Sequence, residues 1–202
     1  MKKQLKALAL MLATMAALTG CAGKIRYPSY YTLNLPPAPD PAPEKDVRSS
    51  IAVREFESPG YLRQGPIVYR RTPEEIGFYE YRRWAADPRV QVTNAVVDHL
   101  TAGGQFAAVS KYDGRSNADY VFSGRLEKLE EVDYGGVKVE VAISAQITRV
   151  ASGATVWSNS VSEAAAVPQR NVPGVVSQMN KSMDIAIANL LSSIPSTMAN
   201  DK

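Results

Sequence analysis

The clearest pattern in the chain is an alternation of apolar and polar residues over residues 137–147. Valine, isoleucine or alanine takes every second position, and most of the residues between them are polar. Period-two alternation predicts a β-strand with one buried face. Residues 119–132 alternate in the same way, and the glycine-rich segment 134–136 predicts a hairpin turn between the two strands. A third strand, 155–161, is expected to continue this antiparallel series.

Two segments instead repeat their apolar residues with helical spacing. Asp87 followed by Pro88 is a strong helix start, because the carboxylate can cap free amides and proline suits the first helical position. Valine and leucine then recur every four residues, and the glycine pair 103–104 predicts the end of the helix. Residues 172–194 carry an apolar face at the same spacing and predict a C-terminal amphipathic helix.

The remaining apolar segments are short and rich in aromatic or β-branched residues. They predict further strands at 30–35, 51–56, 67–71, 76–84 and 106–109. Aromatic residues occupy both faces of 76–84, so we expect that strand to be covered on both sides. The order of strands, helix, antiparallel strands and helix indicates an α+β domain. Its two helices should pack on one face of a largely antiparallel sheet.

The N-terminus has a different pattern. Three lysines at positions 2, 3 and 6 precede an apolar run, 7–17, that is short for a transmembrane span. The run ends in Leu18–Cys21, and small residues before a cysteine resemble the lipobox of bacterial lipoproteins. In such proteins the thiol receives a diacylglycerol, the chain is cut before the cysteine, and the new amine is acylated. The alternatives are an ordinary signal peptide with an incidental cysteine, or a short anchor helix.

These features divide the chain into three parts. Residues 1–20 are the expected signal peptide. Residues 21–49 hold the lipidated cysteine, a tether, the strand 30–35 and a proline-rich loop, which is either a semi-rigid spacer or a ligand for a recognition domain. Residues 50–196 form the α+β domain, which the strand 30–35 is expected to join.

Composition adds few candidate groups for chemistry. The formal net charge of +3 falls close to zero once the signal-peptide lysines are removed, and no basic stripe indicates a nucleic-acid partner. One cysteine and one histidine supply no metal-ligand cluster. His99 is expected to be structural, since the adjacent Asp98 points in another direction on a helix. The acidic pairs 74–75 and 130–131 are expected to be solvated, and no enzyme activity is predicted.

Two aromatic-rich stretches, Tyr61–Arg70 and Phe78–Pro88, follow the motif Tyr-Tyr-Thr-Leu at 30–33. Together with the lipobox and the C-terminal helix, they resemble the ABC-type transport auxiliary lipoprotein family of the PqiC/YmbA type. The acidic-proline pair that usually follows the tryptophan is stretched here to Ala86–Pro88, a small departure. The resemblance covers nearly the whole mature chain and depends on the combination and order of its motifs.

The resemblance implies a role in lipid transport across the cell envelope. Family members are similar to the outer-membrane partners of systems that contain an ABC ATPase, a permease and a periplasmic mammalian-cell-entry (MCE) protein. The expected function is that of a non-enzymatic outer-membrane lipoprotein that docks the MCE assembly. Ala22 rather than aspartate after the cysteine also favours the outer membrane, by resemblance to Gram-negative lipoproteins. The implied fold is similar to the N-terminal domain of TolB, and a homo-oligomeric ring would suit a protein that caps a tube.

The aromatic-rich stretches supply the candidate partner-binding residues, because tyrosine, tryptophan and arginine are typical interface anchors. They are Tyr61, Leu62, Arg63, Tyr69, Tyr79, Tyr81, Arg83 and Trp84. The alternative is that the aromatics belong to the core and the arginines to its solvated edge. No cofactor is expected beyond the acyl groups on Cys21.

Two other functions remain open. A stand-alone lipoprotein that binds one lipid or glycan would contain an apolar cavity. A structural lipoprotein of the cell wall or of a secretion complex would act independently of any transporter.

Overall fold

The computed structural model of the chain describes residues 4, 26–37, 48–115 and 117–195. The lipidation site, Cys21, and all of the predicted signal peptide except residue 4 lie outside these residues, so both stay predictions, as do the domain boundaries. No helix among the described residues is long and apolar enough to cross a membrane.

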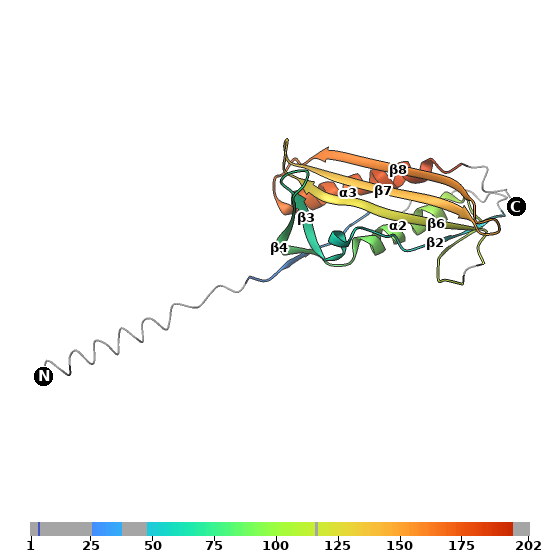
Figure 1. Cartoon of the computed structure of the whole chain (residues 1–202), viewed down its shortest axis with the longest axis horizontal. Coiled ribbons are helices and arrows are strands. Elements are labelled where there is room, and N and C mark those ends of the chain that lie inside the picture. Colours follow the sequence, from blue (N-terminus) through green and yellow to red (C-terminus); the bar gives the residue numbers. More distant parts are fainter. Residues whose placement is uncertain (1–3, 5–25, 38–47, 116, 196–202) are drawn as a thin grey trace.

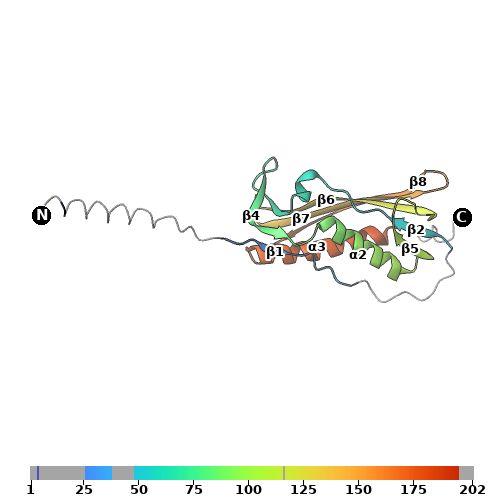
Figure 2. The ribbon, with the colours of Figure 1, turned by 90° about the horizontal axis from the view of Figure 1, so that it is seen from below.

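Eight strands form one sheet, and two helices cover one of its faces (Figures 1 and 2). The strands are β1 (Ser29–Tyr31), β2 (Ser50–Val53), β3 (Pro66–Arg70), β4 (Ile76–Trp84), β5 (Ala108–Lys111), β6 (Tyr120–Val132), β7 (Lys138–Arg149) and β8 (Thr155–Ala166). The helices are α2 (Pro88–Gly103) and α3 (Val172–Ser192), and a short 3-10 helix, η1, spans Gly60–Arg63. This is the α+β arrangement that the sequence predicted.

The sheet is built around β6. One edge of β6 pairs with β7 along nearly its whole length, and β7 pairs in turn with β8, both antiparallel. The other edge pairs in parallel with β2 near the start of β6 and with β3 near its end. Parallel pairs also join β1 to β4 and β2 to β5. The sheet is therefore mixed, and the predicted antiparallel pairing holds for its long strands.

α2 begins and ends where the sequence predicts, and α3 begins at the predicted residue but ends at Ser192, two residues before the predicted limit. Asp87 accepts a hydrogen bond from the backbone N–H of Arg89, Pro88 takes the first helical position, and Gly104 ends α2 in the left-handed conformation. Asn171 caps α3 by accepting from Gly174 N–H. Both helices turn their apolar side chains toward the sheet, so the core lies between the two layers.

Several strand boundaries differ from the sequence prediction. β1 ends at Tyr31, because the next residues leave the sheet and lie over the helices, where the backbone N–H of Asn34 donates to the side chain of Asn180 on α3. β5 begins two residues late, since Phe106 packs into the core instead. β8 runs on to Ala166 because β7 offers a partner for every added residue, although serine and alanine are weak strand formers.

The prediction that residues 76–84 are covered on both sides is wrong. Phe78 is 37% exposed and Glu80 is exposed as well. The β3–β4 hairpin projects from the sheet on the side away from the helices, and its turn, 71–75, is exposed throughout (Figure 2). Only the last part of β4 returns to the body of the domain, where Trp84 is buried.

One close contact in the core depends on glycine. The ring of Phe56 lies against Gly124 on β6 and stacks beside Phe122, with ring centroids 6.1 Å apart. A Cβ built on Gly124 would stand 2.3 Å from the Phe56 ring. The absence of a side chain at Gly124 therefore lets the segment after β2 close over the central strand.

We predict that Gly124→Ala destabilises the domain by about 1–3 kcal/mol, because the added methyl overpacks a full core. Thermal or urea unfolding would measure the change. Gly103→Ala, at the end of α2 where nothing lies within 4 Å of the new Cβ, is the matched control and should be neutral or slightly stabilising. Equal stability of the two variants would contradict the prediction.

Candidate functional site

The face of the sheet opposite the helices carries short polar side chains. Residues directly opposite one another on neighbouring strands share a face. One row of this kind runs across β6, β7 and β8 as Ser123, Gln146 and Ser158, and the next as Arg125, Ser144 and Ser160. The neighbouring positions of β6 and β7 are apolar and buried under the helices. The open face is thus the polar side of the alternation seen in the sequence.

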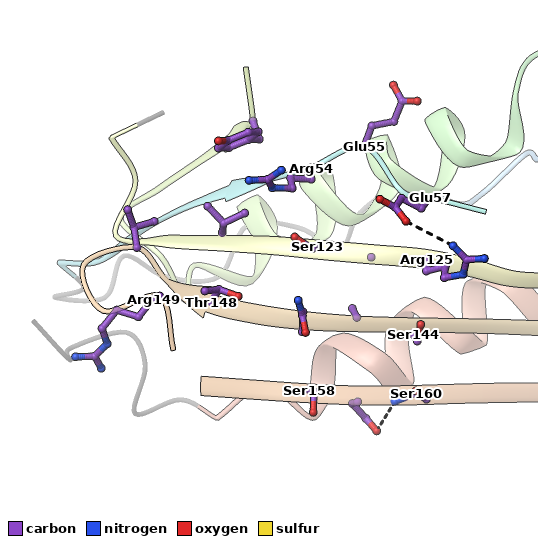
Figure 3. A pocket seen from close by; sticks show the side chains of 18 residues that line it. Arg54, Glu55, Glu57, Ser123, Arg125, Ser144, Thr148, Arg149, Ser158 and Ser160 are labelled. Carbon is purple, nitrogen blue, oxygen red and sulfur yellow. Dashed lines mark hydrogen bonds and ion pairs between the residues drawn. The ribbon is translucent and has the colours of Figure 1, made fainter. Parts of the chain in front are cut away.

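A shallow groove of about 1020 Å³ lies on this open face (Figure 3). Its floor is β6, β7 and β8, and the segment between β2 and η1 forms one wall. Eighteen residues line it: Arg54, Glu55, Glu57, Tyr112, Val121, Ser123, Gly124, Arg125, Ser144, Ala145, Gln146, Thr148, Arg149, Val150, Gly153, Ser158, Asn159 and Ser160. Serine, alanine and glycine residues make up much of the floor, so backbone and small polar groups are accessible there.

Charged groups along the groove contact one another. Arg125 meets Glu57 at 3.5 Å and Glu127 at 3.0 Å, and Glu127 also accepts a 2.8 Å hydrogen bond from Ser144 Oγ. The guanidinium of Arg54 stands 4.1 Å from the centre of the Tyr112 ring. These exposed contacts each contribute little to stability, but they fix charged side chains along the groove.

The candidate partner-binding residues do not form one surface, and none of them lines the groove. Leu62 and Trp84 are buried in the core. Tyr69 and Tyr79 pack together with ring centroids 5.0 Å apart. Leu62 and Trp84 thus contribute to the core and Tyr79 packs against it, while a partner-binding role for any of the eight residues stays a prediction.

The others lie at the surface or at its edge. Arg63 is exposed on η1, and Tyr81 is partly exposed on β4. Arg83 donates to the carbonyl of Gln64 at 2.9 Å and so fastens β4 to the end of η1. Tyr61 is half-buried and donates to the carbonyl of Glu127 at 3.3 Å.

Sequence reasoning missed a buried ion pair at this end of the sheet. Glu130 is fully buried, and its Oε1 accepts from Arg70 Nε at 2.7 Å. The Arg70 guanidinium also lies 6.0 Å from the Tyr61 ring, so η1 covers the pair. Within the described residues, Oε2 of Glu130 has no hydrogen-bond partner. The expectation that the pair 130–131 is solvated is wrong, since Glu131 is only 5% exposed.

The position of Glu131 follows from an irregularity in β6. The register with β7 shifts between Leu126 and Lys128, so the residues after the shift exchange faces. Glu131 then pairs with Val139 on the buried side of β7, where its Oε2 accepts from the hydroxyl of Tyr79 at 2.7 Å. Burial raises the pKa of Glu131 above its ordinary value, and the nearby Asp133 adds to the rise. Burial, together with this hydrogen bond, also raises the pKa of Tyr79.

His99 and the acidic pair 74–75 do not line the groove. His99 is partly buried, and its Nδ1 lies 2.8 Å from the carbonyl oxygen of Ala95 one turn earlier. Glu74 and Glu75 are exposed in the β3–β4 turn. In the described part of the chain, no group of three or more histidine, cysteine, aspartate or glutamate side chains could hold a metal ion.

We predict that Arg70→Met destabilises the domain by about 3–5 kcal/mol, because it leaves the carboxylate of Glu130 buried without its partner. The double variant Arg70→Met, Glu130→Met should recover most of that loss, since two apolar side chains of similar length replace the pair. Urea unfolding of the single and double variants tests this. A double variant less stable than Arg70→Met would contradict it.

We also predict that Glu131→Gln changes the pH dependence of stability. A carboxyl group whose pKa is raised in the folded state stabilises the fold below the unfolded pKa, about 4.3, and this stabilisation is lost as pH rises through the folded value. Glutamine cannot ionise and can still accept from Tyr79. The melting temperature of the variant relative to the wild type should therefore be higher at pH 7 than at pH 4.

Glu74→Gln, in the exposed hairpin turn, is the control, and its difference from the wild type should change little with pH. The prediction is contradicted if the melting temperature of Glu131→Gln minus that of the wild type is the same at pH 4 and pH 7, or is larger at pH 4.

Comparison with known proteins gives a consistent result. The family model for the ABC-type transport auxiliary lipoprotein component matches residues 31–190. No curated protein matches the chain. A crystal structure of a Xanthomonas campestris protein of family DUF330 superposes with a TM-score of 0.69 at 18% identity, covering 81% of this chain and 92% of the other. A second structure, described only as an uncharacterized protein, gives 0.66 at 15% identity and covers 84% and 100%.

The similarity to these two solved structures supports the fold alone, because their sequence identities to this chain are low. The family match spans most of the chain and reaches from β1 to the last turns of α3. It includes both aromatic-rich stretches and every strand that lines the groove. The chain therefore belongs to the ABC-type transport auxiliary lipoprotein component family.

Proposed function

We propose that this protein is a non-enzymatic, outer-membrane lipoprotein of an MCE/ABC-type lipid transport system, and that it docks the periplasmic MCE assembly. The acyl groups on Cys21 would hold it in the membrane, and two or more acyl chains anchor a protein stably. The distant ABC ATPase would supply the energy through its permease. Membership of a transport auxiliary lipoprotein family supports this proposal at the level of the system.

The observation that carries the docking role is the open polar face of the sheet. It offers a groove of about 1020 Å³ with many small side chains on its floor and an ion pair between floor and wall. Contacts of this polar type suit a reversible protein partner, whose interface is about as polar as ordinary protein surface. We therefore place the docking site on β6, β7 and β8 rather than on the aromatic residues of β3 and β4.

The same geometry argues against a stand-alone lipid carrier. Such a carrier needs a mostly apolar pocket that buries most of its ligand. A second hollow, of about 240 Å³ between residues 33–37 and α2, is small, and polar residues such as Gln91, Asn94 and Asp98 form part of its lining. A structural lipoprotein of the cell wall remains the other candidate, and co-sedimentation with cell wall in the absence of the transporter would favour it.

We predict that the tagged full chain, extracted from the envelope in mild detergent, copurifies with the MCE protein. Ser123→Arg combined with Gln146→Arg should lower the recovered MCE protein at least tenfold, because two long side chains would fill the groove. Both positions face away from the core, so the melting temperature should change little.

Ser177→Arg combined with Ala188→Arg, on the exposed side of α3, is the matched control and should leave copurification unchanged. If the wild type recovers no MCE protein, the proposed function is wrong. If both double variants recover it equally, the partner docks elsewhere than the groove.

A further inference from the structure

One face of the β1–β4 pair carries exposed tyrosines. Tyr30 stands opposite Arg83 in the register, so the two side chains share a face, and Tyr81 lies on the same face two residues earlier in β4. Tyr30 is 62% exposed, and Tyr27, just before β1, is 80% exposed. No other large apolar residue in the described part of the chain is as exposed as these two. The core therefore gains little from their rings.

Arginines surround these tyrosines. Arg26 lies close enough to Tyr81 for its charge to act on the hydroxyl. Arg63, exposed at the end of η1, precedes Gln64, whose carbonyl accepts one hydrogen bond from Arg83. A guanidinium has five N–H donors, so Arg83 keeps others for a further acceptor. Within the described residues, none of these three arginines forms an ion pair with a carboxylate.

The carboxylates nearby do not neutralise this charge. Asp87 acts on Arg63 from a distance, but it is held by Arg89, whose Nη2 lies 2.6 Å from its Oδ2. Glu80 lies beside Tyr81. Three guanidinium groups thus share the region with one carboxylate that has no ion-pair partner of its own among the described residues, and the face keeps an excess of positive charge.

The face lies where the chain enters the domain. β1 and β4 occupy the end of the structure at which the N-terminal segment arrives (Figure 2). Five residues lead from Cys21 to Arg26, and a fully extended chain of that length spans at most about 18 Å. Acyl groups on Cys21 would therefore hold this face within reach of the membrane surface.

We propose that the arginine–tyrosine face, formed by Arg26, Tyr30, Arg63, Tyr81 and Arg83, binds the anionic phospholipid headgroups of the membrane that holds the anchor. Guanidinium groups bind phosphate through two parallel hydrogen bonds, and tyrosine suits a surface that is apolar on one side and wet on the other. The inference rests on the anchoring part of the proposed function and not on the docking part.

Headgroup binding at this face orients the groove. β3 joins the sheet at Glu130, near the end of β6, and β4 and β1 follow beyond it. The groove reaches Val121, near the start of β6. The nine residues from Val121 to Glu130 span roughly 30 Å along the strand. One end of the sheet thus meets the membrane, and the groove extends away from it toward a periplasmic partner.

The test uses the lipidated full chain, extracted in mild detergent and reconstituted into vesicles that contain phosphatidylglycerol. Because Cys21 is expected to be acylated, an introduced cysteine supplies the free thiol for a fluorophore. A fluorophore on Ala85→Cys, directly after β4, should transfer energy efficiently to a headgroup-labelled lipid. One on Ala151→Cys, in the turn after β7, should transfer little, because that turn lies beside the start of β6.

Arg26→Glu combined with Arg63→Glu should lower the transfer from position 85 roughly twofold, because the reversed charges repel an anionic surface. Vesicles of phosphatidylcholine alone should lower the transfer of the wild type as well. Arg48→Glu combined with Arg115→Glu is the matched control, with the same change of charge at exposed positions near the start of β6. It should leave the transfer unchanged, and equal melting temperatures verify that both double variants are folded.

Flotation of the vesicles separates this inference from the anchoring on which it rests. Every variant should float with the vesicles, because the acyl groups are unchanged. A wild type that does not float overturns the anchoring and the headgroup contact together. If the wild type floats but both double variants transfer energy equally, the anchoring stands and the headgroup contact is overturned. Equal transfer from positions 85 and 151 in the wild type also overturns it.

Discussion

The structure depends on the pairing of β6 with β7. The two strands join over most of their length, and every other strand is placed through them: β8 on the far side of β7, and β2 and β3 in succession along the free edge of β6. Because side chains alternate strictly along a strand, this one pairing decides which residues meet the helices and which form the open face. The groove and the core are two consequences of the same register.

The irregularity within that pairing places two carboxylates, Glu130 and Glu131, in buried positions. By shifting the register after Leu126, it turns Leu129 and Glu131 toward the core and brings Glu130 beneath η1 beside Arg70. Buried charges such as these contribute little net stability, yet removing one partner is expensive. Their effect is to fix how β3, β4 and η1 sit on the end of β6, with Tyr79 joined to Glu131 and Tyr61 lying over Arg70.

The open face continues onto β8, whose outward serines form part of the groove floor. Along the same strand, the side chain of Asn159 accepts from the backbone N–H of Ser160 and donates to Ser193 after α3.

The sequence by itself determined the periodic elements, because their signals are local. The alternation in 137–147 predicted β7, and the Asp87–Pro88 start and Gly104 end predicted the limits of α2. The order of motifs in the two aromatic-rich stretches indicates the family from the sequence alone. Local signals also sufficed to expect two helices over one face of the sheet.

Only the tertiary structure decided the parallel pairs, the full length of β8 and the burial of Glu130 and Glu131. Each depends on a partner far away in the chain: β7 extends β8, and η1 covers the Arg70–Glu130 pair. The same holds for the candidate site. The tyrosines and arginines of η1, β3 and β4 were the residues that the sequence made conspicuous, whereas much of the groove floor is formed by serines, a glutamine and a threonine from three strands. Small polar residues form a continuous surface only when the sheet places their strands side by side. The pairing of strands depends on distant parts of the chain, so a local sequence pattern does not predict this surface.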